Sequence, residues 1–444
     1  MDHKALAEQL VKTCLAAGAD AAEIYLQAGR NLSIDVRNGE LETVEESASQ
    51  GVGFRVFVKG RMAFSSCNDF RPASLESAAA RAVELARSTT ADPNNVLPTQ
   101  PGTAAVEGLY DPAIGKVPME KKIEMAIAVE KAAMKDARIT KSAGAFFGER
   151  EMEIFLANSH GLSKNYKSSG FSFGVSVVAE KGEQKSSGGE SCSRRFFADL
   201  QPPARIAERA AASAIELLDP RMVKTQRAAV IFDPDVASAV LGGVLQAVNG
   251  ERVVQRASFL AAMLNQKIAS DLVTLVDDGI RPKGPGSAPF DGEGVPTGRH
   301  VIVEKGVLKA FMYNTAVAKR AGVQSTGNAS RGGFTSLPGI GPHNFYMAAG
   351  STPPAEIVKA TKTGLWVKGV TGYGINAVNG NFSGGAEGLW IENGQVAYPV
   401  KGLTIAGTAA EMLNGIDLVG SELDLNRGLA APMFRITSLQ IGGE

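Results

Sequence analysis

The sequence has 444 residues, of which 44% are hydrophobic and 21% are charged, values normal for a globular protein with substantial cores. Lysine plus arginine and aspartate plus glutamate number 46 each, so the chain has no net charge to attract nucleic acid. No apolar stretch approaches the roughly 20 residues of a membrane-spanning helix, and the mixed charges of the first residues do not resemble a signal peptide. The three cysteines lie far apart and form no CxxC pair. We therefore expect a cytoplasmic protein with reduced thiols, and neither a membrane nor a nucleic acid as its partner.

The first predicted unit, residues 1–100, contains a helix, a set of antiparallel strands and a second helix. Apolar residues recur at three-to-four spacing up to residue 17, and Gly18 follows where a helix C-cap belongs. Asn38-Gly39 is a hairpin-turn signal, and Pro72 opens the second helix. The strands are expected at 22–27, 32–36, 52–58 and 62–64.

A linker is predicted at 101–118, where little periodicity is present. The second unit, 119–225, has the same order of helix, strands and helix, which suggests a structural repeat although the letters themselves show none. Its helices are expected at 119–135 and from Pro202-Pro203 to about residue 218, and its strands at 143–147, 151–157, 170–179 and 186–197.

The third unit, 226–444, is predicted to be rich in strands with few helices. A strand at 228–232 precedes a helix at 235–248, and Asn393-Gly394 is another hairpin turn. Further strands are expected at 271–276, 300–304, 306–313, 364–370, 387–392, 395–398 and 433–441. Runs of antiparallel strands with segregated helices indicate an α+β protein and not a doubly wound sheet.

The sequence offers no local metal-binding or catalytic motif. None of the four histidines (His3, His160, His300 and His343) has another histidine within five residues, so no HExxH pair can be written. No GxSxG elbow is present either. We therefore predict no catalytic residue and no metal ligand in this chain.

Four carboxylates beside glycines leave an alternative open. A hard cation could use them, which would make the chain a self-sufficient hydrolase, but the ligand spacing of an EF-hand is absent. In the favoured interpretation they cap their own backbone in turns. The residues are Asp277, Asp278, Asp291 and Glu293.

Several segments together resemble the TldD/PmbA family, also called modulators of DNA gyrase. Single pieces, such as FDGEGVPT over 290–297, are weak, but their order and spacing extend across nearly the whole chain. The segments are 18–23, 37–42, 51–57, 290–297, 306–308, 325–328, 343–346, 380–383, 388–394 and 397–400.

The resemblance implies a pair of subunits, of which this chain is the PmbA/TldE-like one. TldD-like chains carry HExxxH, which supplies zinc ligands and a glutamate, plus a cysteine near the C-terminus. The equivalent segment here, 235–259, reads DVASAVLGGVLQAVNGERVVQRASF and has no histidine, and residues 415–444 have no cysteine. We therefore expect no cofactor in this chain and zinc in a TldD-like partner, the two forming a heterodimer, with a homodimer as the alternative.

The family resemblance also implies that the complex degrades small or unfolded peptides and that this chain completes the chamber and helps to hold the peptide. A strand edge within 300–400 could hold an extended peptide through main-chain hydrogen bonds. The predicted peptide-binding residues are Thr326, Gly327, Asn328, Arg331, Asn344 and Asn381, although the family usually has an acidic residue where Asn381 stands. A regulatory binding module of the gyrase-modulator type, with no role in proteolysis, is the alternative.

Overall fold

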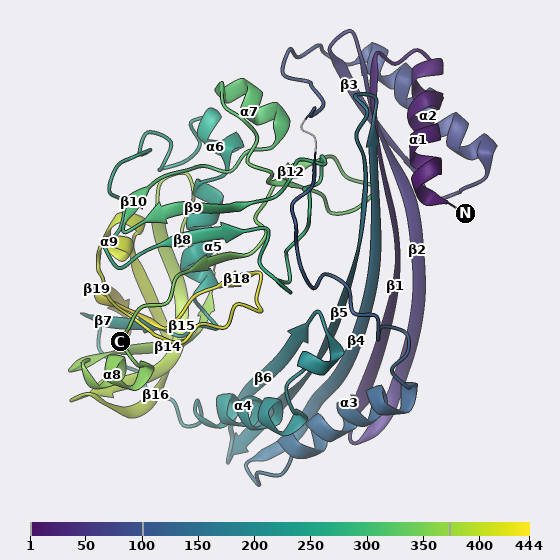
Figure 1. Cartoon of the computed structure of the whole chain (residues 1–444). Helices are drawn as coiled ribbons and strands as arrows, with labels where there is room; N and C mark the ends of the chain where they lie inside the picture. The colour runs from purple at the N-terminus through teal and green to yellow at the C-terminus, as the bar shows by residue number, and fades with distance from the viewer. Residues whose placement is uncertain (1, 100–101, 373) are drawn as a thin grey trace.

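The computed structural model describes residues 2–99, 102–372 and 374–444. Met1 and Gln100 of the first predicted unit and Pro101 of the predicted linker lie outside the described residues. Figure 1 shows a long curved sheet on one side of the molecule and a β-rich domain on the other. The α+β prediction is confirmed.

The first two units share one antiparallel sheet with the strand order β3-β2-β1-β4-β5-β6. Predicted strands 22–27 and 32–36 are one strand, and 143–147 and 151–157 are another, because pairing continues through the residues between them in an unbroken β1–β4 register. The strands are β1 (Ala21–Arg37), β2 (Glu40–Val58), β3 (Arg61–Cys67), β4 (Ile139–Asn158), β5 (Ser163–Lys181) and β6 (Gln184–Arg194).

Two helix pairs cover one face of this sheet, one pair at each end. In β1 the even-numbered residues around Ile24 pack under α1 and α2, and those around Ile34 pack under α3 and α4. Side chains alternate between faces along a strand, so odd-numbered residues such as Tyr25 point to the opposite face. The helices are α1 (His3–Ala16), α2 (Pro72–Ser88), α3 (Met119–Ala133) and α4 (Pro203–Ile215), and a short 3₁₀ turn lies at Phe197–Asp199.

The C-terminal domain contains a six-stranded sheet of order β16-β15-β14-β7-β19-β17, in which β16 also pairs with β19, so five of the strands close a ring. A five-stranded sheet, β10-β9-β8-β13-β18, shares its core. The strands are β7 (Gln226–Phe232), β8 (Leu275–Asp278), β9 (Arg299–Glu304), β10 (Val307–Leu308), β11 (Ala329–Ser330), β12 (Gly339–Ile340), β13 (Phe345–Met347), β14 (Thr363–Thr371), β15 (Asn381–Glu392), β16 (Gln395–Thr408), β17 (Ile416–Val419), β18 (Leu429–Ala430) and β19 (Phe434–Gly442).

Helices in this domain are short: α5 (Ser238–Ala247), α6 (Gly250–Val254), α7 (Thr315–Ala321), α8 (Pro354–Lys359) and α9 (Ala409–Asn414). Several predicted boundaries were wrong. Strands β15 and β16 are longer than the predicted 387–392 and 395–398, and three other elements begin or end elsewhere. The strand predicted at 306–313 pairs with β9 only at Val307–Leu308, because Met312 instead exchanges main-chain bonds with Val248 and Gly250 beside α5. The strand predicted at 271–276 starts only at Leu275 after a turn at Ser270, and the helix predicted from 235 starts at Ser238 after a turn capped by Asp233.

The predicted linker is fixed against both parts of the molecule. Its described residues, 102–118, contain no helix before α3 and no strand. The N–H of Ala104 donates to the carbonyl of Pro289 at 2.8 Å, and the carbonyl of Glu107 accepts from Lys283 at 3.0 Å. The carbonyl of Leu109 accepts from Ser169 in β5 at 3.0 Å. The segment therefore connects the sheet to the C-terminal domain by hydrogen bonds as well as by the chain.

Candidate functional site

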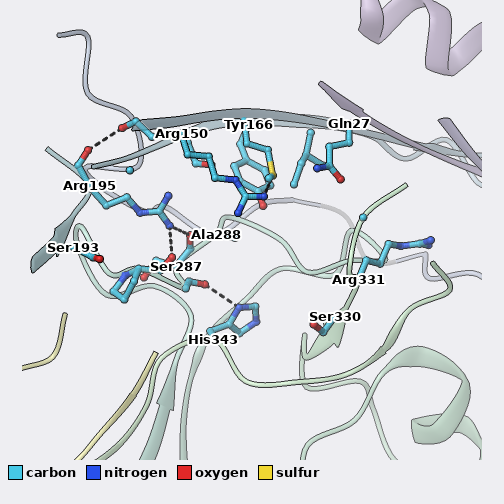
Figure 2. Close-up of a pocket in the computed structure, with 18 of the residues that line it drawn as sticks. Gln27, Arg150, Tyr166, Ser193, Arg195, Ser287, Ala288, Ser330, Arg331 and His343 are labelled. Carbon is cyan, nitrogen blue, oxygen red and sulfur yellow. Dashed lines mark hydrogen bonds between the residues drawn. The ribbon is translucent and has the colours of Figure 1, made fainter. Parts of the chain in front are cut away.

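A pocket of about 660 Å³ lies between the face of the large sheet opposite the helices and the loops of the C-terminal domain. Strands β1, β4 and β5 form one wall, and the loops at 283–292, 329–333 and 341–343 form the other. Figure 2 shows Arg150 and Tyr166 on the sheet side and His343 and Ser330 on the loop side. The volume lies in the range of small-ligand pockets.

A buried cluster of four charges joins the sheet to the C-terminal domain beside this pocket. Glu23 and Arg55 are cross-strand neighbours in β1 and β2, and the guanidinium donates to both carboxylate oxygens, at 3.0 and 2.6 Å. Arg55 also donates to Glu293 at 2.8 Å, and Arg331 pairs with Glu23. The four side chains are at most 6% exposed. Two positive and two negative charges therefore compensate each other where an unpaired charge would be costly.

The loop that carries Arg331 is seated on β1 and β2 by shape as well as by charge. The Arg331 guanidinium lies 4.8 Å from the Tyr25 ring centroid. Phe334 packs over Gly51 and Gly53, and a Cβ added at Gly53 would lie 2.5 Å from the carbonyl oxygen of Phe334. Glycine at these two positions lets the loop approach the sheet.

Buried polar contacts hold the loops behind the pocket wall. The Asn328 amide donates to Asp277 at 2.7 Å and accepts from the Thr326 hydroxyl at 2.7 Å. The N–H of His343 donates to the other Asp277 oxygen at 2.8 Å. The His343 ring is held between two carbonyl oxygens, with Nε2 at 2.7 Å from that of Gly327 and Nδ1 at 3.3 Å from that of Gly286.

The predicted peptide-binding residues have different positions. Only Arg331 lines the pocket; Thr326, Gly327 and Asn328 belong to the supporting network. Asn344 is 2% exposed; its side chain accepts from the N–H of Gly286 and donates to the Ser287 hydroxyl. These hydrogen bonds fix the 284–287 loop. Asn381 is exposed at the start of β15, in the six-stranded sheet of the C-terminal domain. Direct peptide contact by these residues stays a prediction.

The four carboxylates near glycines are occupied by donors from the chain itself. Asp291 accepts from the N–H groups of Glu293, Val295 and Ala329 at 2.9 to 3.0 Å, and burial together with Glu293 raises its pKa. Asp278 accepts from the N–H of Ile280 at 3.1 Å. Asp278 and Asp291 thus bind main-chain groups of their own turns, as in the favoured interpretation. For Asp277 and Glu293 that interpretation was wrong, because Asp277 accepts from Asn328 and His343, and Glu293 accepts from Arg55 and Thr315, all outside their own turns. Among the residues that the structure describes, no three His, Cys, Asp or Glu are grouped so that they could hold a metal ion.

The segment where the family resemblance would require zinc ligands does not fit a metal. Helix α5 presents Val240, Leu241, Val244 and Ala247 to the core, and all four are fully buried. None of these side chains has a zinc-binding atom.

Sequence reasoning missed Glu23, Arg55, Tyr25 and Tyr166. The first two carried a signal, because each is a lone charge inside an apolar strand segment, AAEIYL and GFRVF. A charge at such a position needs a buried partner. The partner of Arg55, Glu293, lies in a loop 238 residues further along the chain. Sequence periodicity cannot show a contact over that distance.

No helix in the described ranges is long and apolar enough to cross a membrane. The described cysteines are free thiols, of which Cys14 and Cys192 are buried.

Comparisons with known proteins agree along the whole chain. Models of the PmbA/TldA metallopeptidase family match as domain 1 over residues 22–86, as the central domain over 112–218 and as the C-terminal domain over 225–443. The metalloprotease PmbA of Escherichia coli O157:H7 is 30% identical over 100% of this chain and 97% of its own length.

Two solved structures have the same fold. A Bacteroides thetaiotaomicron protein proposed to be a modulator of DNA gyrase superposes with a TM-score of 0.91 at 28% identity, with 100% of both chains covered. TldE from Thermococcus kodakarensis superposes with a TM-score of 0.89 at 25% identity, over 98% of this chain and 99% of that one. The chain belongs to the PmbA/TldD metallopeptidase family, as its sequence pattern predicted.

Proposed function

We propose that this chain is the metal-free, non-catalytic subunit of a cytoplasmic metallopeptidase complex that degrades small or unfolded peptides. Its partner is a TldD-like chain that carries the zinc. This chain completes the chamber and holds part of the peptide in the pocket between the sheet and the C-terminal domain.

The observation that carries the proposal is the chemistry of α5. In a TldD-like chain this segment supplies zinc ligands and a glutamate, whereas here 235–259 contains no histidine and α5 is part of the apolar core. Glu251, the carboxylate that follows in α6, is bound to Gln255 and Arg320. A hydrolytic zinc site needs three protein ligands and an open position, which these residues do not supply.

A holding role is supported by the pocket and by the buried polar contacts behind its wall. The pocket has a volume of about 660 Å³, and the exposed Gly332 lines it. Main-chain recognition of an extended peptide is independent of its sequence, which suits a peptidase of low selectivity.

The test uses the purified chain, the TldD-like chain of the same cell, and their mixture, each assayed for zinc and for cleavage of an unstructured peptide. We expect no stoichiometric zinc and no cleavage with this chain alone, and chelator-sensitive cleavage by the mixture. Chelator-sensitive cleavage by this chain alone would overturn the proposal, and His3, His160, His300 and His343 would then be the first residues to replace.

A further inference from the structure

The pocket contains arginines that have no carboxylate partner. Arg150 in β4 and Arg195, just after β6, both line it, and in the part of the chain that the structure describes neither has a carboxylate oxygen within 4.0 Å. The neighbouring Arg194 also lacks one. Of the other charged groups of the lining, Lys283 pairs with Asp199 at 2.7 Å, Glu149 with Lys122 at 2.6 Å, and Arg331 with Glu23. Asp291 has no ion pair within the described ranges and accepts from three main-chain N–H groups.

Arg195 is held in place without its charge being neutralised. Its Nε donates to the carbonyl of Gly284 at 3.0 Å, and its Nη2 donates to those of Pro285 and Ser287 at 2.9 and 3.0 Å. Burial lowers the pKa of this guanidinium, since its charge is partly removed from water. The Nη1 group has no acceptor among the described residues, and Figure 2 shows the guanidinium in the pocket.

The Arg150 side chain has fewer contacts than that of Arg195. Its one hydrogen bond within the described residues is a weak one, to the Met152 sulfur at 4.0 Å. Figure 2 shows its side chain extending from the sheet into the pocket, as that of Arg195 does. Two guanidinium groups thus offer unused N–H donors to the same cavity, and a planar fork of donors matches a carboxylate.

Two tyrosines of the same wall add hydroxyl donors. Tyr25 is 6% exposed and lines the pocket with Tyr166, and neither hydroxyl has a hydrogen-bond partner in the described chain. The Tyr166 ring is fixed edge-on against Phe290, with centroids 5.1 Å apart. Neither hydroxyl is used within the described chain, so both are free to donate to an acceptor bound in the pocket. Burial raises the pKa of Tyr25 to about 12, so its hydroxyl remains a donor at neutral pH.

We propose that this pocket binds the free C-terminal carboxylate of a peptide, with Arg150 and Arg195 as its cationic partners and Tyr25 and Tyr166 as hydroxyl donors. The identification of the ligand as a peptide rests on the proposed function, whereas the need for an anion rests on the uncompensated arginines. A chain end is the carboxylate that every peptide carries whatever its sequence, which suits the proposed peptidase of low selectivity.

The experiment measures binding of a fluorescently labelled unstructured peptide to the full chain by anisotropy. The peptide is prepared as the free acid, as the C-terminal amide, and as an amide with one internal glutamate. Inorganic phosphate serves as competitor. We expect the acid to bind about tenfold or more tightly than either amide, which corresponds to about 1.4 kcal/mol. Millimolar phosphate should displace it only weakly.

Variants identify the site. Arg150→Gln should lower affinity for the acid about tenfold and leave affinity for the amide unchanged, because a charge-assisted hydrogen bond is lost. Tyr25→Phe, which removes only a hydroxyl, should lower the affinity for the acid by a few fold. Arg81→Gln, at an exposed position of α2, is the matched control and should change nothing. Thermal unfolding of each variant checks that it is folded.

Equal binding of acid and amide by the folded chain would overturn the carboxylate site, as would unchanged binding by Arg150→Gln and Tyr25→Phe. Equal binding of the internal-glutamate amide would overturn the C-terminal assignment, and stronger binding of phosphate would overturn the carboxylate assignment. The two proposals can fail separately. If the mixed subunits cleave peptide but this chain binds acid and amide equally, only the carboxylate site is refuted. If this chain prefers the acid but the mixture is inactive, only the proposed peptidase complex is refuted.

Discussion

Arg55 in β2 and Glu293 in the loop after β8 form a buried ion pair of 2.8 Å between the large sheet and the C-terminal domain. Glu293 uses its other oxygen to accept from the N–H of Thr315 at 2.8 Å, at the start of α7. One carboxylate thus connects a strand of the first unit to a helix of the last. The position of the pocket between sheet and loops depends on this connection.

Replacing Glu293 by Gln should destabilise the protein by about 3 kcal/mol, because removing one partner of a buried pair leaves the other charge poorly compensated. Chemical denaturation of the wild type and the variant measures this change. The control is Asp271→Asn, which breaks the exposed Lys267–Asp271 pair of 2.8 Å and should cost less than about 0.5 kcal/mol. Similar losses in both variants would show that the Arg55–Glu293 pair has no special role.

Replacing Gly53 by Ala should loosen the 329–336 loop, because the new Cβ would meet the Phe334 carbonyl oxygen. Overpacking of this kind costs about 1–3 kcal/mol. Gly170→Ala in β5 is the matched control, since nothing lies within 4 Å of its added Cβ. Thermal unfolding and limited proteolysis of the loop should separate the two variants, and equal behaviour would contradict the close contact.

The cysteines should differ in reactivity. Burial raises the pKa of the Cys14 thiol to about 12, and Cys192 is also buried, whereas Cys67 is partly exposed. Because the thiolate is the reactive form, alkylation of the native protein followed by peptide mass mapping should find label first at Cys67. Denaturant should make all three react alike. Rapid native labelling of Cys14 would contradict the packing of α1 on the sheet.

Tyr25 should make stability fall at alkaline pH. Its native pKa is raised to about 12, above the ordinary value of 10, so the unfolded state loses the proton first. The free energy of unfolding is unaffected by this group below pH 10 and decreases between about pH 10 and 12. The difference between wild type and Tyr25→Phe should therefore change across this window and be constant below it. A constant difference throughout would contradict the burial of Tyr25.

The fold class and the turns were predictable because their signals are local. Asn38-Gly39 and Asn393-Gly394 do form hairpin turns, and Pro72 does begin α2. Strand lengths were underestimated, since residues such as Gly29 and Arg150 interrupt the apolar alternation but are paired by strands on either side. Neighbouring strands, which periodicity does not see, supply the hydrogen bonds.

The candidate site was predictable only in part. The family pattern directed attention to Arg331 and to the loops of Asn328 and Asn344, but their buried side chains support the wall. Arg150 and Tyr166 come from strands of another domain and lie in no motif. They meet the loops only because the sheet and the C-terminal domain pack together, and that contact is long-range in sequence.

The most direct test of the account locates zinc within the assembled complex. This chain and its TldD-like partner are separately treated with chelator, freed of it, and mixed in both combinations with an untreated subunit. We expect full cleavage when only this chain was treated, no cleavage when only the partner was treated, and about one zinc ion per pair of chains in the active mixture. Loss of activity on treating this chain alone, with the partner intact, would contradict a metal-free subunit.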